Sequence, residues 1–327
     1  MDTVHRFLFE ALDIRGVLVQ LGPAWQAMHA RREYPQAVRA LLGEMAAVTT
    51  LMGSNLKTPG RLSFQLQGNG QVSMLVVDCD EQLRLRGMAR SQSDGGNGGE
   101  ARDSQSTSLR SHSGSAVQSR DSKDGVATPR SGVQGMQSQP APTDKIIDLV
   151  GDGQLVLTLQ TDGADPYQSY VPIEGDSLAQ IFEHYLALSD QQPARLWLMA
   201  NEKMACGLLL QKLPNADACD ADGWTRVETL ANTVTDAELG LPPEDLLTRL
   251  FGEEVVRLFA PRYAAWHCPR NEEKVRNVLL SLGREELESM LEKADIIEVD
   301  DEICGHEYRF GPEILNELFP PEGRVLH

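Results

Sequence analysis

Apolar residues recur at helical and strand spacings along the first two thirds of the chain, which predicts an α+β core of paired β-hairpins with buried helices. The segment 37–56 is apolar on most of its circumference, so it predicts a buried helix with Pro35 in its first turn. A second helix is expected after Ser177, because Gln180 stands three residues later as a capping-box partner. Two later apolar runs are typical of strands, 195–200 and 207–211.

Two glycine-containing turns predict hairpins in this core. Each turn separates two apolar runs: 62–66 and 72–77 around Asn69-Gly70, and 146–150 and 155–159 around Asp152-Gly153. Asn-Gly and Asp-Gly favour the positive φ angles of tight hairpin turns. A phosphate-binding glycine loop is the weaker interpretation, since neither turn has a third glycine or a Gly-Lys-Ser/Thr sequence.

Past residue 222 the pattern changes to amphipathic helices joined by short breaks. Pro242-Pro243 followed by two acidic residues predicts the N-terminus of one helix. This helix and the residues after Gly252 are unusually apolar for a linker; the side chains concerned are Leu246, Leu247, Leu250, Phe251, Val255, Val256 and Phe259. We expect them to pack onto the core at rest. From residue 266 onward the spacing predicts two helices, a hairpin between about 296 and 310, and a last helix at Pro312.

A polar segment interrupts the first folded part of the chain. Residues 91–143 are mostly Ser, Gly, Gln, Asp and Arg, with too few large apolar side chains to offset the entropy lost on ordering. We expect a disordered insertion, and a tolerated surface loop is favoured over a basic or phosphorylatable arm because its charges nearly cancel. The expected domains are a core over 1–214 that contains this insertion, a helical linker over 215–265 and a small domain over 266–327.

Charge narrows the range of partners. The chain has 30 Lys and Arg against 48 Asp and Glu, a formal net charge of −18, and 25 of the acidic residues lie from position 215 onward. Long-range repulsion disfavours nucleic acid and anionic membranes as partners. The first ten residues lack signal-peptide features, and no apolar run reaches the roughly 18 to 20 residues that span a bilayer. We therefore expect a cytoplasmic protein with mostly reduced thiols.

Five cysteines are an odd number for a structural disulfide framework, so each is considered alone. Cys206 falls in a predicted strand, and the sequence contains no Cys-x-x-Cys. This favours a buried structural cysteine over an activated thiol, and we expect no enzyme activity and no catalytic residue.

Nine short motifs stand in a fixed order along the chain. They are 4–10 (VHRFLFE), 13–16 (DIRG), 34–35 (YP), 64–70 (FQLQGNG), 86–90 (RGMAR), 150–153 (VGDG), 175–178 (GDSL), 207–211 (GLLLQ) and 213–214 (LP). Together they resemble the thirty-three-kDa redox-regulated chaperonin family over essentially the whole chain except the insertion.

The resemblance implies an ATP-independent holdase with an α/β core, a helical linker and a small C-terminal redox domain. Stress opens the last two parts, and apolar surface then binds unfolding client proteins; oxidised members also tend to form homodimers. The seven apolar linker side chains named above are therefore the candidate client-binding residues. The alternative is a constitutive protein-binding module that is never gated and binds clients fully in the reduced, unstressed state.

The chain departs from the family at the zinc site of the C-terminal domain. Members usually carry four zinc-binding cysteines, as Cys-x-Cys and Cys-x-x-Cys. Here only Cys268 and Cys304 stand in these motifs, while Arg270 and Asp301 occupy the other positions. A tetrathiolate zinc site is thus impossible within one chain, and we expect no cofactor.

Three further expectations follow from this loss. A mixed site with His267 and His306 is disfavoured, because the adjacent side chains of His267 and Cys268 point in different directions. An ion pair between Arg270 and Asp301 is expected in place of two metal ligands. A disulfide between Cys268 and Cys304 would keep redox control, but the sequence leaves open whether the bond forms and whether it locks or releases the domain.

Overall fold

The computed structural model describes residues 1–30, 32–56, 58–91, 107–110, 145–161 and 163–320. It divides into two compact units. Unit 1 comprises Met1–Gln105, Asp144–Pro269 and Glu302–Gly305, and unit 2 comprises Ser106–Thr143, Arg270–Asp301 and His306–His327. Each unit has an apolar core of its own.

The first sheet of unit 1 has the strand order β11-β1-β2-β10-β9, with β12 also pairing with β1. Its members are β1 (Thr3–Phe9), β2 (Ile14–Leu21), β9 (Ala194–Ala200), β10 (Ala205–Lys212), β11 (Val256–Leu258) and β12 (Arg262–Tyr263). All these pairs are antiparallel. The strands expected at 195–200 and 207–211 are confirmed as β9 and β10.

The second sheet has the order β13-β5-β4-β3-β7-β8. Its members are β3 (Gly60–Gln67), β4 (Val72–Asp80), β5 (Arg84–Ser91), β7 (Gln154–Thr161), β8 (Tyr167–Val171) and β13 (Ala265–Trp266). The hairpin expected around Asn69-Gly70 is confirmed as β3 and β4, in which Phe64 pairs with Val77. Strand β13 pairs with β5 in parallel.

The second expected hairpin is wrong. Residues Ile146–Val150 form a short helix, α3, and β7 pairs with β3 and β8 instead. Ile146, Leu149 and Val150 are all buried, a spacing of three and four that one face of a helix provides and an alternating strand does not. Gly151, with φ of +66°, ends the helix.

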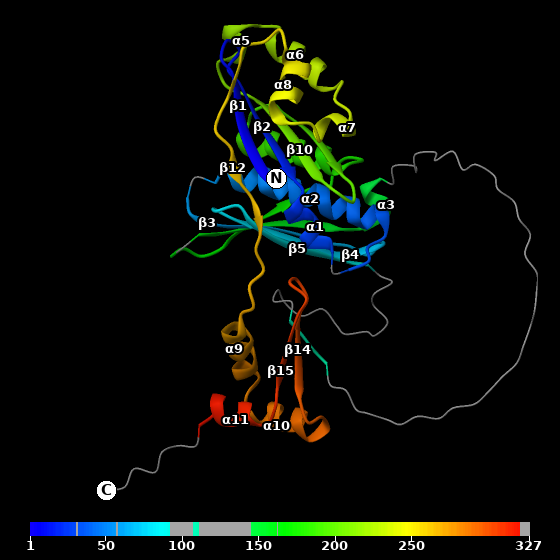
Figure 1. The fold of residues 1–327 in the computed structure, drawn as a ribbon, viewed down its shortest axis with the longest axis vertical. Helices are drawn as coiled ribbons and strands as arrows, with labels where there is room; N and C mark the ends of the chain where they lie inside the picture. Colours follow the sequence, from blue (N-terminus) through cyan, green and yellow to red (C-terminus); the bar gives the residue numbers. More distant parts are fainter. Residues whose placement is uncertain (31, 57, 92–106, 111–144, 162, 321–327) are drawn as a thin grey trace, which may run out of the picture. The chain divides into compact units, whose positions relative to one another are not determined.

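One long helix fills the space between the two sheets. Helix α2 (Gln36–Ser54) contacts strands of both, as Figure 1 shows, which confirms the predicted helix buried on most of its circumference. Helix α4 (Leu178–Asp190) packs on β9, and the Ser177 hydroxyl accepts a hydrogen bond from the Gln180 N–H at its N-terminus, as expected. Helix α1 (Pro23–His29) contacts β5 and β13.

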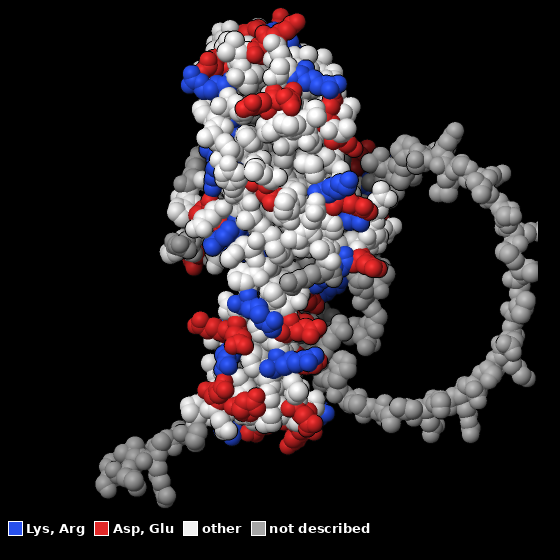
Figure 2. All heavy atoms as spheres, in the orientation of Figure 1, with Lys and Arg blue, Asp and Glu red and all other residues white. Residues whose placement is uncertain are grey.

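The linker part of unit 1 is helical up to Phe251. Its helices are α5 (Ala216–Cys219), α6 (Gly223–Ala231), α7 (Asp236–Leu239) and α8 (Pro243–Phe251). On the face shown in Figure 2, basic side chains are interspersed with acidic ones, and no basic patch covers the described residues there. No helix within the described ranges is long and apolar enough to cross a membrane.

Unit 2 is a small α+β unit. It contains α9 (Glu272–Leu282), α10 (Arg284–Lys293), β14 (Ile297–Asp301), β15 (His306–Phe310) and α11 (Glu313–Leu318), close to the elements expected from the sequence. A further strand, β6 (Thr107–Arg110), pairs with β14 and lies within the segment 91–143 that was expected to be disordered. Ser91 itself ends β5. The remainder of that segment lies outside the described residues.

Candidate functional site

The apolar face of helix α8 lies on the first sheet of unit 1. Leu246, Leu247, Leu250 and Phe251 are all buried, in a cluster with residues of β1 and β2. The ring of Phe251 lies edge-on to that of Phe9, with centroids 4.9 Å apart. Full burial of one such side chain is worth about 1.5–3 kcal/mol, so this face holds the linker on the core.

The three remaining linker residues lie at strand β11. Val256 is partly buried, whereas Val255 is 65% exposed and Phe259 is 44% exposed. A groove of about 340 Å³ separates α8 from β11; it is lined by Glu244, Leu247, Thr248, Phe251, Gly252, Glu254, Val256 and Leu258. The structure therefore divides the candidate client-binding set into residues concealed on the sheet and residues already accessible.

Strand β11 is an edge strand of the first sheet. The Val255 carbonyl accepts a hydrogen bond from the Glu10 N–H at 3.2 Å, and the Phe259 N–H donates to the Arg6 carbonyl at 2.9 Å. Backbone groups alternate in direction along an antiparallel strand, so those of Val256 and Leu258 point away from β1. An edge of this kind favours pairing with another extended chain.

A buried amide anchors the linker, and sequence reasoning missed it. Gln20 of β2 is 6% exposed and its Nε2 donates to the carbonyls of Leu239 and Leu241, at 2.8 and 2.6 Å. Its position in an apolar strand, opposite no predicted polar partner, was the only signal in the sequence. Two surface ion pairs, from Arg226 to Glu254 and to Asp220, connect segments of the linker with one another.

Cys268 and Cys304, whose pairing the sequence left open, form a disulfide. Cys268 and Cys304 have Cα atoms 5.6 Å apart and are separated by 36 residues. Cys304 is 2% exposed, while Cys268 is partly exposed. Cys268 is the last residue of a strap, residues 264–268, whose backbone is hydrogen-bonded to β5: the His267 N–H donates to the Leu85 carbonyl at 2.9 Å.

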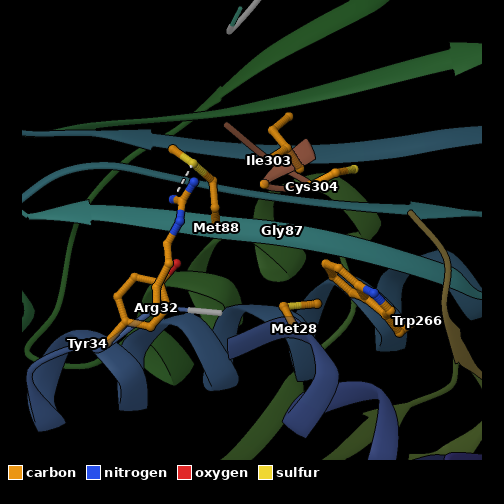
Figure 3. Close-up of a pocket in the computed structure, with 9 residues that line it drawn as sticks. Met28, Arg32, Tyr34, Gly87, Met88, Trp266, Ile303 and Cys304 are labelled. Atoms are coloured by element: carbon orange, nitrogen blue, oxygen red, sulfur yellow. Dashed lines mark hydrogen bonds between the residues drawn. The ribbon is translucent and has the colours of Figure 1, made fainter. Parts of the chain in front are cut away.

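Cys304 lies in the turn Glu302–Gly305 between β14 and β15. This turn belongs to unit 1. Two arginines hold Glu302: Arg90 of β5 pairs with its carboxylate and Arg32 donates to its carbonyl. Arg32 also donates to the Met88 sulfur at 3.0 Å. Figure 3 shows the small pocket at this place; it is lined by Met28, Arg32, Tyr34, Gly87, Met88, Trp266, Ile303, Cys304 and Gly305.

The two positions that lack the family's cysteines have other contacts within unit 2. Arg270 donates to the Glu307 carbonyl, and its guanidinium carbon lies 5.0 Å from the centre of the Tyr308 ring. Asp301 stands opposite His306 in the β14–β15 ladder. The Arg270 guanidinium is directed to the β15 backbone and the Tyr308 ring, rather than to the Asp301 carboxylate expected from the sequence.

The residues present do not fit the family's tetrathiolate zinc site. Both remaining sulfurs are bonded to each other, and an arginine occupies one of the missing positions. No group of three or more His, Cys, Asp or Glu side chains suited to a metal occurs in the part of the chain that the structure describes.

The other three cysteines lack the features of a redox pair: Cys79 and Cys206 are buried, and Cys219 is not bonded to another cysteine. Burial raises the pKa of the Cys79 thiol and of the Cys206 thiol to about 12 each. Both side chains are buried, as expected for Cys206. At neutral pH these groups are protonated and poor nucleophiles. Cys219 is exposed and unpaired with the other cysteines.

Comparison with known proteins identifies the class. The model of the Hsp33 protein family matches residues 2–311. The 33 kDa chaperonin of Nitrosococcus oceani is 37% identical over 97% of this chain and 94% of its own, and that of Methylobacillus flagellatus is 34% identical over 98% and 95%. The crystal structure of a 33 kDa chaperonin from Thermotoga maritima shares the fold, with a TM-score of 0.71, 20% identity and coverage of 97% of this chain and 98% of that one.

The fold and these relatives define a holdase chaperone. The chain belongs to the Hsp33 protein family.

Proposed function

We propose that this holdase binds unfolding proteins through the apolar linker surface, without ATP, when stress lifts α8 and β11 from the core. The observation that carries the proposal is the burial of Leu246, Leu247, Leu250 and Phe251 on the first sheet. Release of α8 would present these side chains and the sheet face beneath them at once. Unfolding clients expose apolar segments, which such a surface matches.

Gating in this chain would not use zinc. The residues at the family's metal site do not fit the ion, so the free energy that metal coordination normally adds to such a small fold is supplied by other contacts. In unit 2 these are the core around Val299 and Tyr308 and the contacts of Arg270. Among the residues that the structure describes, unit 2 has eight buried apolar side chains, so we infer that heat alone destabilises it.

The same reasoning extends to partners and location. The protein would act in the cytoplasm, as an acidic chaperone with no enzyme activity, and its net charge of −18 disfavours nucleic acid and membrane partners. A homodimer on activation is proposed from the family resemblance. The domain limits at 214 and 265, and the roles of Cys268 and Cys304 as regulatory residues, stand as part of this proposal.

A second candidate is a constitutive, ungated binding module. Val255 and Phe259 are exposed beside the groove and the β11 edge in the docked state, which favours some client binding without release. The two candidates differ in the state that binds: the gated holdase gains activity on opening, whereas the module is fully active at rest.

Aggregation suppression separates them. Light scattering of citrate synthase at an unfolding temperature is followed with the full chain pretreated by oxidation, reduction or heat. The gated holdase gives weak protection at rest and strong protection after opening. Phe259→Ser lowers the protection in both states, because Phe259 is exposed at rest and belongs to the linker surface that binds after opening. Tyr170→Ser is the matched control, since Tyr170 is an exposed aromatic residue on β8, away from the linker. Absence of protection in every state would contradict both candidates.

A further inference from the structure

We propose that the Cys268–Cys304 disulfide is a reducible latch that holds the Glu302–Gly305 turn on the core strand β5, and that a dithiol reductant opens it. The site is a thiol–disulfide exchange site at which reduction releases the turn and oxidation closes the latch. In the mostly reduced cytoplasm expected from the sequence, the latch is therefore closed only after oxidation. Release of the turn follows from the geometry alone, and its effect on client binding rests on the proposed function.

The fixed side of the latch is the strap that carries Cys268. Three strap N–H groups donate to backbone carbonyls of unit 1: Ala264 to Asp2 at 3.0 Å, Ala265 to Leu83 at 3.0 Å, and His267 to Leu85 at 2.9 Å. Residues 265–266 also pair with β5 as strand β13. Cys268 is therefore attached to the core independently of the disulfide.

The movable side is the turn that carries Cys304. The strands that flank it, β14 and β15, belong to unit 2, whereas the turn itself belongs to unit 1. The turn is also held by Arg32 and by the Arg90–Glu302 ion pair, whose side chains are 40% and 20% exposed. These contacts break and re-form reversibly, while the disulfide forbids departure of the turn altogether. The redox state of two sulfurs thus decides whether the turn is free to leave.

Accessibility sets the direction of the chemistry. Cys304 is buried and Cys268 is partly exposed, so the thiolate of an incoming dithiol attacks the Cys268 sulfur. The Cys268–Cys304 bond breaks, a mixed disulfide forms, and Cys304 leaves as a thiolate that takes a proton. Arg32 and Cys304 line the same pocket, and the positive charge of the Arg32 guanidinium stabilises the Cys304 thiolate as it leaves. The second thiol of the reductant then displaces Cys268, so two electrons pass from the dithiol, which becomes a disulfide.

The absence of two of the family's cysteines determines which redox change releases the turn. Arg270 and Asp301 stand where the family has further thiols, so oxidation of this site forms only the Cys268–Cys304 bond, and that bond restrains the turn. The family resemblance implies opening on oxidation; this chain would open on reduction. The disagreement between the residues and the family's zinc site is what carries the inference.

Hydrogen exchange of the full chain tests the latch directly. Non-reducing peptide mapping first establishes the Cys268–Cys304 linkage in the aerobically purified protein. Deuterium uptake of peptides covering 300–308 is then compared with and without a phosphine reductant. We expect reduction to speed exchange at the turn by at least about tenfold. Cys304→Ser should show fast exchange without reductant, and Cys219→Ser, which removes an exposed cysteine outside the latch, should behave as the parent chain.

The outcomes separate the latch from the holdase. Absence of the linkage in the mapped protein, equal exchange in both redox states, or faster exchange after oxidation would each overturn the latch. Faster exchange on reduction with no protection of citrate synthase in any state would support the latch and overturn the proposed function. The reductant arm uses the unmodified chain, so it stands even where Cys304→Ser fails to fold.

Discussion

Cys268 and Cys304 join a strap paired with β5 to the turn between β14 and β15, with Cα atoms 5.6 Å apart and a sequence separation of 36. The family resemblance implies four zinc-binding cysteines at this place, and only these two are present. Their bond is a single covalent restraint on the Glu302–Gly305 turn. The consequences of this restraint, and of the linker's attachment to the core, are open to measurement.

Reduction is expected to lower the stability of the folded chain. A disulfide that closes a loop of this length restricts the unfolded chain by roughly 3–4 kcal/mol in the chain-entropy model. Guanidinium unfolding of the oxidised and the reduced chain should show a lower midpoint after reduction. Cys268→Ser should match the reduced chain in both buffers, and an identical midpoint in all three samples would contradict the expectation.

Restoring the two missing thiols is expected to restore metal binding. In the double variant Arg270→Cys with Asp301→Cys, four thiolates stand in the Cys-x-Cys and Cys-x-x-Cys spacing that suits tetrahedral zinc. Purified under reduction, this variant should retain about one zinc per chain by metal analysis. Arg270→Cys alone is the control and should retain much less, and tight stoichiometric zinc in the parent chain would sink the explanation.

Loss of the Gln20 amide is expected to loosen the linker. Gln20→Leu leaves the carbonyls of Leu239 and Leu241 buried without this donor, at a cost of about 1–3 kcal/mol. Hydrogen exchange across 236–251 should accelerate, and resting protection of citrate synthase should rise. Gln26→Leu is the matched control, because the Gln26 amide also donates to a backbone carbonyl, that of Lys203, but at an exposed site. Equal exchange in the two variants would count against a role for Gln20 in linker attachment.

Stability is expected to fall as the pH rises from about 4.5 to 7. Burial, and secondarily the charge of Asp236 on the linker, raises the pKa of Glu44 from an ordinary 4.5 to about 7. Between these values the folded chain binds more protons than the unfolded chain, so the free energy of unfolding decreases as the pH rises. Glu44→Gln should remove this slope and stabilise the chain at pH 8 by about 1–3 kcal/mol, with little effect at pH 5. Glu33→Gln, at an exposed carboxylate, should leave the slope intact.

Much of the fold follows from local sequence patterns. The buried helix α2, the β3–β4 hairpin and the cap at Ser177 each rest on spacing or turn chemistry within a few residues, and all three are confirmed. Helix α3 was misjudged because a five-residue apolar run fits a strand or a helix, and its three buried side chains are decided by tertiary packing.

The candidate site was predictable only in part. The disulfide partners stood out because a known four-cysteine pattern was half missing. The Gln20 anchor and the turn contacts of Arg32 join residues more than 200 positions apart, and no local pattern encodes such a pair. Arg270 was paired with the wrong partner, since the carbonyl of Glu307 and the ring of Tyr308 carry no charge for sequence reasoning to detect.

The central claim is that this chain is a gated holdase whose linker surface is concealed at rest. Its most direct test is light scattering of citrate synthase at an unfolding temperature, with an equal concentration of the full chain before and after reduction and mild heating, on samples with measured zinc content. We predict weak protection before treatment and strong protection after it, with no stoichiometric zinc in either sample. Equal protection before and after treatment, or none in both, would contradict the claim.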